Sequence, residues 1–347
     1  MRRAVPWTVL LLLTAMGMLH AQGDEAVLLR YKFHQGEVLR TIEIVKGTIP
    51  VRTDVVTPAG TPAGGAGIDN MAVSVALETT AVKVLTVNSV DANGVAAVTI
   101  RVERLLVNTN TQVGDQTMSN RLEFADGKLT ASGTGVQEMP PDKLQQLEQL
   151  LNTAFQVEMD PLGGTKPIGQ DVDQVWQQAM GQSLAGVDFG KLSRATMGLP
   201  EQPVKVGDIW ENSYEPGENE HGVTGSSKML LAALTSENGH QVAKIRANSY
   251  LKIEDQDAKP VDGMMLGGLT QGMQTKLEFL EVNMASELNM DLELGQMLRT
   301  ASNITMNMDQ TMSMDLGAAF GGQQLMMTFK VQTRDAPLRS QTTTMVE

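Results

Sequence analysis

Apolar and polar residues alternate more strictly between Leu280 and Leu316 than anywhere else in the chain. Because successive side chains on a strand point to opposite faces, this alternation predicts two long strands, each with one buried and one solvated face. A break at Gly295-Gln296 separates the two strands. The apolar positions before the break are Leu280, Val282, Met284, Leu288, Met290, Leu292 and Leu294, and those after it are Ile304, Met306, Met308, Met312, Met314 and Leu316. The pattern indicates a fold class but no activity.

Strand-forming residues dominate most of the remaining chain, and the middle of the chain is the exception. Segments rich in strand formers are Val27 to Phe33, Glu37 to Val45, Met71 to Val87, Val95 to Val107 and most of the stretch from Pro203 to Val331. Between them, Leu144 to Phe155 and Val172 to Met180 carry apolar residues at helical spacing. The sequence therefore predicts a mainly β protein with long antiparallel strands in a curved sheet or open barrel, in two related halves joined by two amphipathic helices.

Five regions follow from this arrangement. Residues 1–21 are expected to form a signal peptide, 22–138 a first β-rich half, 139–199 a helical connection, 200–335 a second β-rich half and 336–347 a tail. The length without the signal exceeds the usual size of one domain. A chain of this length can form either one continuous curved sheet or two stacked β units.

Three short matches, in the same order, indicate that the two halves are related. They join Gln35-Gly36-Glu37 with Val206-Gly207-Asp208, Asn93 to Arg101 with Asn238 to Arg246, and Leu122 to Ser132 with Leu292 to Ser302. Each match alone is weak, because hairpin turns recruit Asn and Gly for backbone reasons. Their common order favours an internal duplication.

The first residues have the composition of a secretory signal. Arg2 and Arg3 precede an apolar run from Val9 to Leu13, and Leu19-His20-Ala21 is a suitable cleavage site. The apolar span is shorter than the roughly 20 residues that a transmembrane helix needs, which favours a signal over an anchor. We therefore expect a secreted protein, periplasmic or extracellular, without a stable membrane anchor.

Charge and cysteine content narrow the possible partners. The net charge is −13 and cysteine is absent. An acidic chain repels nucleic acid and anionic membrane surfaces, so nucleic-acid binding is not expected. Without cysteine the chain has no disulfide framework and no thiol chemistry, and its core depends on burial.

Methionine is the most distinctive component, with 23 residues against 4% aromatic residues. Met306-x-Met308 and Met312-x-Met314 resemble the thioether clusters that bind Cu(I), because soft sulfur ligands suit that ion. The same spacing places all four side chains on one strand face, where a sheet buries its core and where methionine packs well. Core packing is the favoured interpretation, and no cofactor is expected.

A binding face for a hydrophobic ligand is the second interpretation of the methionines. A curved sheet covered by two amphipathic helices would suit lipid or another apolar molecule. The residues expected to line it are Met284, Met290, Met306, Met308, Met312 and Met314. The segment Val261 to Met273 is apolar yet glycine-rich, and we interpret its residues Met264, Met265 and Leu266 as a lid over the ligand.

No catalytic motif is recognisable in the chain. A Gly-x-Ser-x-Gly elbow, a phosphate-binding loop and a His-Glu-x-x-His sequence are all absent. We therefore expect a noncatalytic binding protein for an apolar ligand or an envelope partner. The alternative is a structural or scaffolding envelope protein with a filled methionine-rich core, and a Cu(I)-binding protein is less favoured.

Several turn and strand-start motifs carry a resemblance over the whole mature chain. They are Leu29 to Glu37, the hairpin from Asp91 to Val98, the turn from Met159 to Gly163, and Leu199 to Trp210. In these segments the chain resembles an uncharacterised family of secreted bacterial proteins. The resemblance implies secretion and carries over no functional residues.

Overall fold

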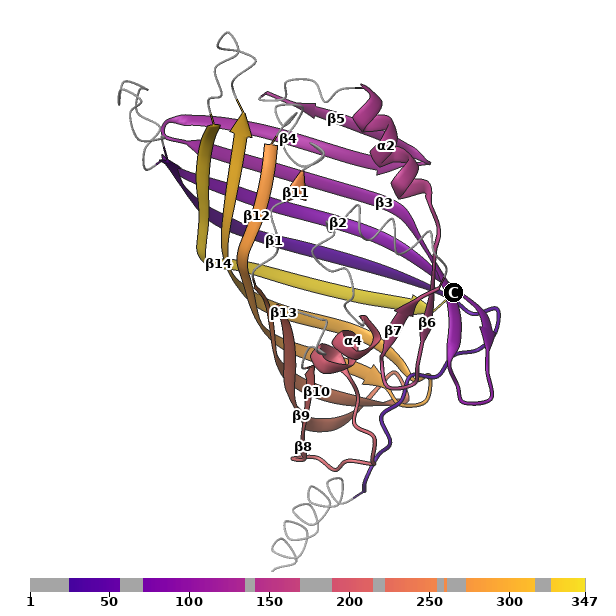
Figure 1. Ribbon diagram of the computed structural model, residues 1–347. Helices are drawn as coiled ribbons and strands as arrows, with labels where there is room; N and C mark the ends of the chain where they lie inside the picture. Colours follow the sequence, from indigo (N-terminus) through magenta and orange to yellow (C-terminus); the bar gives the residue numbers. More distant parts are fainter. Residues whose placement is uncertain are drawn as a thin grey trace, which may run out of the picture.

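The chain folds mainly into one open, curved antiparallel β-sheet, as the computed structural model shows in Figure 1. The structure describes residues 25–56, 71–134, 141–168, 189–214, 222–254, 259–260, 273–315 and 326–346. The signal peptide and the helix expected from Val172 to Met180 therefore lie outside the described residues. The predictions of a mainly β fold and of long antiparallel strands are confirmed, and the sheet is continuous.

Strands of the first part of the chain lie side by side in sequence order. They are β1 (Val38–Val56), β2 (Met71–Val90), β3 (Ala96–Val113), β4 (Gln116–Ala125) and β5 (Lys128–Gly133). Two short strands, β6 (Phe155–Met159) and β7 (Thr165–Pro167), pair with each other, and β6 also pairs with β3. A helix, α2 (Pro141–Asn152), overlaps the apolar stretch from Leu144 to Phe155, but Phe155 itself begins β6. A further helix, α4 (Phe189–Met197), was not predicted.

Strands of the second part also follow one another across the sheet. They are β8 (Ile209–Tyr214), β9 (Val223–Glu237), β10 (His240–Glu254), β12 (Met273–Asp291), β13 (Gln296–Asp315) and β14 (Met326–Val346), with the short β11 (Lys259–Pro260) beside β12. The predicted pair of long strands around Gly295 corresponds to β12 and β13. Across the sheet the order is β5-β4-β3-β2-β1-β14-β13-β12-β10-β9-β8, so β5 and β8 are its edges.

The first and last long strands, β1 and β14, join the two parts of the sheet. Their register runs from Leu39 opposite Val346 to Val56 opposite Thr328. The prediction that residues 336–347 form a tail is therefore wrong for residues 336–346, which belong to a central strand. The threonines near this end have high strand propensity but are not apolar, so the hydrophobic pattern did not reveal the strand.

A bulge interrupts the pairing of β14 with its neighbours β1 and β13. Arg334 and Asp335 together stand opposite the single residue Asn307, and Asp335 has a positive φ of 49°. The Asp335 amide donates a hydrogen bond of 2.7 Å to the Asn307 side-chain oxygen. Beside the bulge, Gly47 lies against the carbonyl of Pro337. This close approach requires a residue without a side chain.

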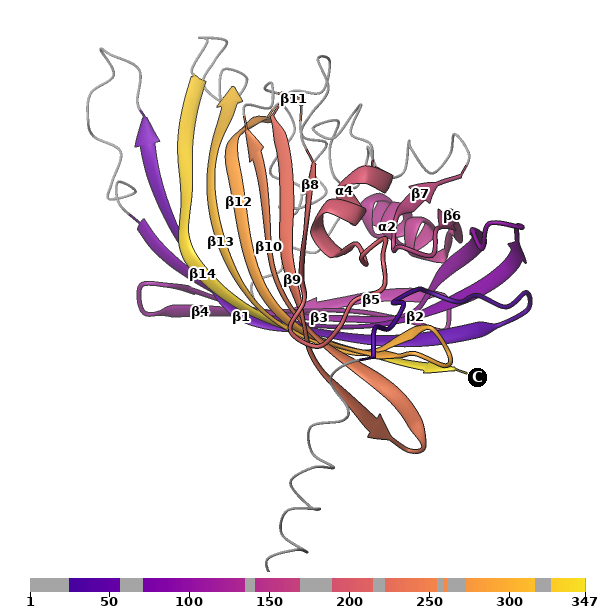
Figure 2. The same ribbon diagram turned by 90° about the horizontal axis from the view of Figure 1, so that it is seen from below.

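The two faces of the curved sheet differ in exposure. Along β1, residues 46, 48, 50 and 52 are exposed, whereas residues 45, 47, 49 and 51 are half-buried. Both described helices lie on the inner side of the curve in Figure 2. We call the side that carries α2 and α4 the concave face and the other side the convex face.

Buried clusters fill parts of the concave face. The largest contains Leu231, Ile245, Leu288 and Met290, and smaller ones surround Val98 and Ile253. The segment from Val27 to Phe33, which was expected to be a strand, instead crosses the strand ends. Apart from a β-bridge between Val27 and Val204, its amides donate to Pro161 and Gly295 rather than to a neighbouring strand.

Two turns from the matched segments make the same backbone hydrogen bonds. The Gly36 amide donates to Val87 and the Val87 amide donates to Glu37. In the second part, the Gly207 amide donates to Leu231 and the Leu231 amide to Asp208. Both glycines have a positive φ, so the two turns share their conformation as well as their sequence.

Substitution of Gly47 tests the junction between β1 and β14. A β-carbon at this position overlaps the Pro337 carbonyl and Leu338, so Gly47→Val should lower the free energy of unfolding by roughly 2 kcal/mol or more. Thr48→Val, on the exposed side of the same strand, should stay within about 0.5 kcal/mol of the wild type. Urea denaturation measures both. Equal stability of Gly47→Val and the wild type would contradict the packing of β14 described above.

Tyr31, in the segment from Val27 to Phe33, makes the stability of the fold depend on pH. Although Tyr31 as a whole is half-buried, burial of its hydroxyl raises the pKa of Tyr31 to about 12 from its ordinary value of 10.0. Unfolding therefore releases a proton between about pH 10 and pH 12, and stability falls as the pH rises through this window, by about 2.7 kcal/mol at most. Chemical denaturation of Tyr31→Phe at pH 9 and pH 11 should show a smaller fall than the wild type. An identical fall in both proteins would exclude Tyr31 as its source.

Candidate functional site

Three of the methionines predicted to bind a ligand lie together on the concave face. In the pairing of β12 with β13, Met284 stands opposite Ile304, Met306 opposite Val282, and Met308 opposite Leu280. Directly paired residues of an antiparallel sheet share a face, so these six side chains form one apolar patch. All six are half-buried. We call them the methionine patch.

The other predicted ligand-binding methionines are placed differently. Met290 has no exposed surface and belongs to the largest buried cluster, where it stands opposite Met297. The backbones of Met312 and Met314 lie in β13 opposite Thr275 and Met273, but the structure does not describe their side chains. The proposed lid residues, Met264, Met265 and Leu266, also lie outside the described residues. The structure thus brings together half of the predicted set.

The apolar surface continues beyond the methionine patch onto the strands of the first part. Through the pairing of β14, β1, β2 and β3, further half-buried apolar side chains share the concave face; they include Leu338, Val45, Ile49, Val51, Val73, Val75, Leu77 and Val107. Sequence reasoning missed these residues as part of the site. The alternation at Val73, Val75 and Leu77 was a usable signal, but only the register shows that it faces the methionines.

The two described helices cover the concave face near its two ends. At one end, the Leu129 amide of β5 donates a hydrogen bond of 2.8 Å to the Glu148 carboxylate of α2. At the other end, the Ser249 hydroxyl of β10 donates one of 2.7 Å to the Thr196 carbonyl of α4. α4 also packs against β8 and β9. Figure 2 shows the long strands that carry the apolar surface curving around the two helices.

The methionine patch offers little convergence of sulfur atoms for copper. The residues directly opposite Met306 and Met308 are aliphatic, so the nearest cross-strand neighbours of both supply no thioether. Within the described residues, no group of three or more His, Asp or Glu side chains is placed to hold a metal ion. Copper binding therefore stays a prediction from the sequence motif.

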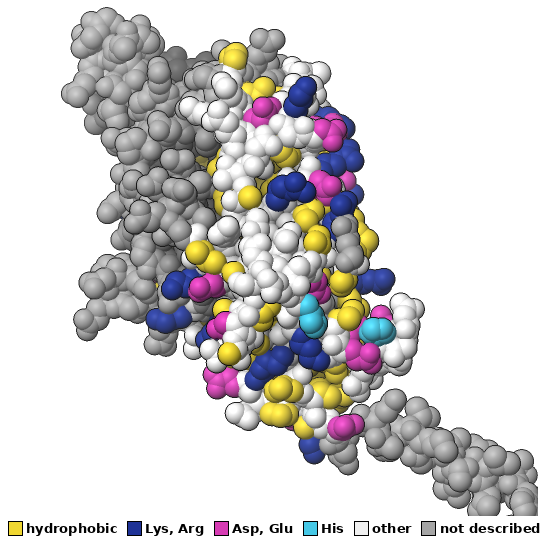
Figure 3. All heavy atoms as spheres, turned by 90° about the vertical axis from the view of Figure 1, so that its right-hand side faces the viewer, with side chains coloured by type: hydrophobic (Ala, Val, Ile, Leu, Met, Phe, Trp, Pro, Cys, Tyr) yellow, Lys and Arg dark blue, Asp and Glu magenta, His cyan; other side chains and the backbone are white. Residues whose placement is uncertain are grey.

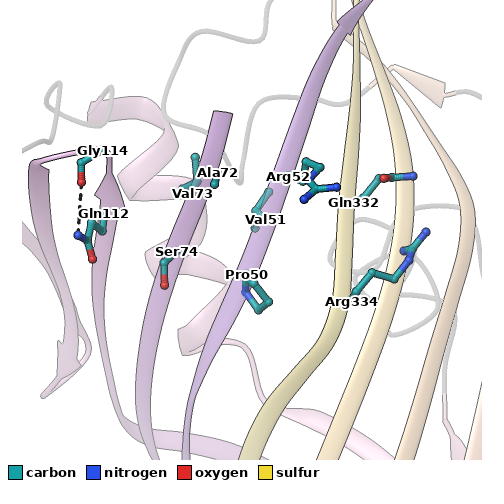
Figure 4. Close-up of a pocket in the computed structure, with 10 residues that line it drawn as sticks. All are labelled: Pro50, Val51, Arg52, Ala72, Val73, Ser74, Gln112, Gly114, Gln332 and Arg334. Atoms are coloured by element: carbon teal, nitrogen blue, oxygen red, sulfur yellow. Dashed lines mark hydrogen bonds between the residues drawn. The ribbon is translucent and has the colours of Figure 1, made fainter. Parts of the chain in front are cut away.

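A pocket of about 480 Å³ lies on the convex face near the bulge (Figure 4). It is lined by Pro50, Val51, Arg52, Ala72, Val73, Ser74, Gln112, Gly114, Gln332 and Arg334. Arg52 stands directly opposite Gln332, and Ser74 opposite Gln112, so their polar groups share one side of the sheet. These residues come from four strands and one turn, and no sequence motif pointed to them.

The charge of Arg334 in this pocket is largely satisfied by the protein itself. Its guanidinium donates a hydrogen bond of 2.8 Å to the Asp309 carboxylate and lies 5.2 Å from the centre of the Phe279 ring. The hydrogen bond with Asp309 raises the pKa of Arg334 above its ordinary value. The Gln112 amide donates a hydrogen bond of 3.3 Å to the Gly114 carbonyl, and Arg52 and Gln332 add further donor groups to the lining.

Charges of both signs are interspersed along the surface. Figure 3 shows acidic, basic and apolar side chains mixed on the side that it presents. Several opposite charges pair across strands, such as Lys46 with Glu78 at 2.6 Å and Lys228 with Glu211 at 2.8 Å. His240 lies 3.0 Å from Oδ2 of the buried Asp291 carboxylate, whose other oxygen accepts a hydrogen bond from the Glu293 amide in the β12–β13 turn. These contacts stabilise strands and turns.

Comparisons with known proteins do not identify a family. No family model matches the sequence, and no curated protein matches it. Two outer membrane proteins of solved structure are similar in part: OprG from Pseudomonas aeruginosa, and an outer membrane channel from Pseudomonas putida F1. The first has 8% identity, a TM-score of 0.23 and coverage of 90% of this chain and 98% of its own. The second has 9% identity and a TM-score of 0.22, and the match covers 94% of this chain and 98% of its own. Similarity at this level carries no inference about fold or function.

None of the described helices is long and apolar enough to cross a membrane. The resemblance to an uncharacterised secreted family stays a prediction, as do the signal peptide and the location outside the cytoplasm. The candidate site must therefore be judged by its own chemistry.

Oxidation of individual methionines tests the accessibility of the methionine patch. Met284, Met306 and Met308 are half-buried, whereas Met229 and Met290 are 2% and 0% exposed. Brief treatment of the ligand-free protein with hydrogen peroxide should oxidise the first three several-fold faster, because reaction requires access to the sulfur. Peptide mass spectrometry measures each rate. Uniform protection of all five would show a filled core instead.

Proposed function

We propose that the protein is a secreted, noncatalytic binding protein that takes an apolar ligand on its concave face. The observation that carries the proposal is the half-buried apolar surface on both sides of β14, from the methionine patch to Val51 and Val73, with the buried Thr333 and Ala336 between its two parts. Such a surface binds apolar molecules because contact removes it from water. Flexible methionine side chains suit ligands of variable shape.

Differences in burial among the methionines favour a ligand over a filled core. Met229 and Met290 are almost completely buried in the largest cluster, so this sheet buries methionine fully where it builds a core. Met284, Met306 and Met308 lie on the same face of the sheet and stay half-buried. The partial exposure of so many apolar side chains is typical of a binding surface.

The alternative is a structural or scaffolding envelope protein, in which the same surface contacts another protein. Both functions place the protein outside the cytoplasm, in the periplasm or beyond the cell, as the predicted signal peptide requires. Cu(I) binding is a weaker candidate, because the described geometry favours it only through the spacing of Met306 and Met308.

We also propose that the two parts of the sheet arose by internal duplication. The equivalent hydrogen bonds of Gly36 and Gly207 support this, together with the three sequence matches. On this proposal β1 corresponds to β8, and β2 and β3 correspond to β9 and β10. The concave face is then built from two copies of one meander.

A pair of adjacent substitutions on β12 tests the ligand proposal. Met284→Lys places a charge on the concave face, whereas Ala285→Lys places it on the exposed convex face beside it. Met284→Lys should weaken binding of a fluorescent long-chain probe by about tenfold or more, since an unpaired charge must be desolvated under the ligand. Ala285→Lys should bind as the wild type does.

Thermal unfolding of both variants completes the test. A half-buried lysine can extend its ammonium group into water, so both variants should remain folded. Binding by Met284→Lys equal to that of Ala285→Lys would refute the proposed site. Unfolding of Met284→Lys alone, while the wild type binds no probe, would favour the filled core.

A further inference from the structure

A row of polar residues crosses the concave face obliquely to the strands. Through direct pairing, Ser286 stands opposite Ser302 and Ser302 opposite Ser340. One step along, Thr300 pairs with Thr342 and Thr342 with Glu43. We call this row the polar band; its members are Ser286, Thr300, Ser302, Ser340, Thr342, Thr344, Thr41, Glu43 and Lys83. It spans β12, β13, β14, β1 and β2.

The polar band separates two apolar regions of different burial. On one side of it lie Leu288 and Leu39, which are 3% and 4% exposed. On the other side lie the methionine patch and Leu338, which are half-buried. On β12 and β1 the burial therefore changes at the polar band, although buried side chains also lie beyond it, at Thr333 and Ala336 on β14 and at Ile253 on β10.

The polar band combines hydroxyl groups with one pair of opposite charges. The Lys83 ammonium donates a hydrogen bond of 2.7 Å to the Glu43 carboxylate, and the two side chains keep 40% and 34% of their surface exposed. The hydroxyls of Ser286 and Ser302 bond to each other at 2.8 Å. Hydroxyls can both donate and accept, and the charges of Glu43 and Lys83 cancel. The band is therefore polar without net charge.

We propose that the ligand is an amphiphile with a zwitterionic head and a long alkyl chain. The chain lies on the methionine patch and the adjoining apolar strands, and the head lies over the polar band. Lys83 contacts the anionic group of the head, and Glu43 contacts its cationic group. From Ser302 to Met308 the strand rises about 20 Å, roughly the length of an extended chain of about sixteen carbons. This inference rests on the function proposed above and specifies its ligand.

Three probes with the same alkyl chain and different heads test the proposal. Hexadecylphosphocholine is zwitterionic, palmitate is anionic and hexadecyltrimethylammonium is cationic. Each is titrated below its micelle concentration against the same fluorescent long-chain reporter bound to the full mature protein. The wild type should bind hexadecylphosphocholine about tenfold more tightly than either charged probe, because each charge of its head meets an opposite charge.

Neutralisation of one partner at a time should then change the preference for the head. Glu43→Gln leaves Lys83 unpaired and should raise the affinity for palmitate, relative to the cationic probe, by about tenfold. Lys83→Gln should shift the same ratio by about tenfold in the opposite direction. Partly exposed ion pairs contribute little to stability, so both variants should fold, which thermal unfolding verifies.

The ion pair between Lys46 and Glu78 supplies a matched control. It joins the same two strands, at 2.6 Å, but lies on the convex face. Lys46→Gln and Glu78→Gln should leave the relative affinities for the three probes unchanged within about twofold. A shift in these controls equal to that in the variants of Glu43 and Lys83 would overturn the proposal, since it would reflect overall charge.

Two further outcomes separate this inference from the function on which it rests. If all probes bind to the wild type, and Met284→Lys abolishes binding while the two neutral variants keep the wild-type preference, only the position of the head is wrong. If the wild type binds none of the three probes, both the amphiphile and the apolar-ligand function are wrong.

Discussion

Backbone pairing between β1 and β14 is the interaction on which the rest of the sheet depends. Each part of the chain forms a meander of consecutive strands, which needs only local connections. The junction between them instead joins the two ends of the chain, from Leu39 with Val346 to Val56 with Thr328. Closing so long a loop costs entropy that only an extended ladder of hydrogen bonds can offset. Without this junction there would be two smaller sheets and no continuous concave face.

The bulge in β14 determines which side chains reach that face. Thr333 and Ala336 are three residues apart, so in a regular strand they would point to opposite sides. Because Arg334 and Asp335 together stand opposite Asn307, both Thr333 and Ala336 point to the concave side, and both are completely buried. Arg334 is thereby directed to the convex face, where it pairs with Asp309. One extra residue thus keeps the two faces chemically distinct along the whole strand.

The sequence predicted what depends on local periodicity. The alternation between Leu280 and Leu316 predicted β12, β13 and the shared face of Met284, Met306 and Met308. It failed for the end of β14, where threonine and serine occupy the inward positions. It also assigned Met290 to the same site, although burial places that residue in the core. Periodicity gives the face of a residue, but only the register across strands shows which distant residues fill or leave open the space beside it.

The polar band limits how far the cluster around Leu288 extends along the concave face. Packing a core over Glu43 and Lys83 would remove both charges from water, and that cost exceeds what their mutual attraction returns. Ser286 and Ser302 escape the same cost, because they satisfy each other and are buried. The cluster around Leu288 therefore extends up to the serines, while the centre of the band stays accessible to solvent or to a polar group of a ligand. Beyond it Met284, Met306 and Met308 are half-buried, while Leu280 beside them packs against the cluster around Ile253.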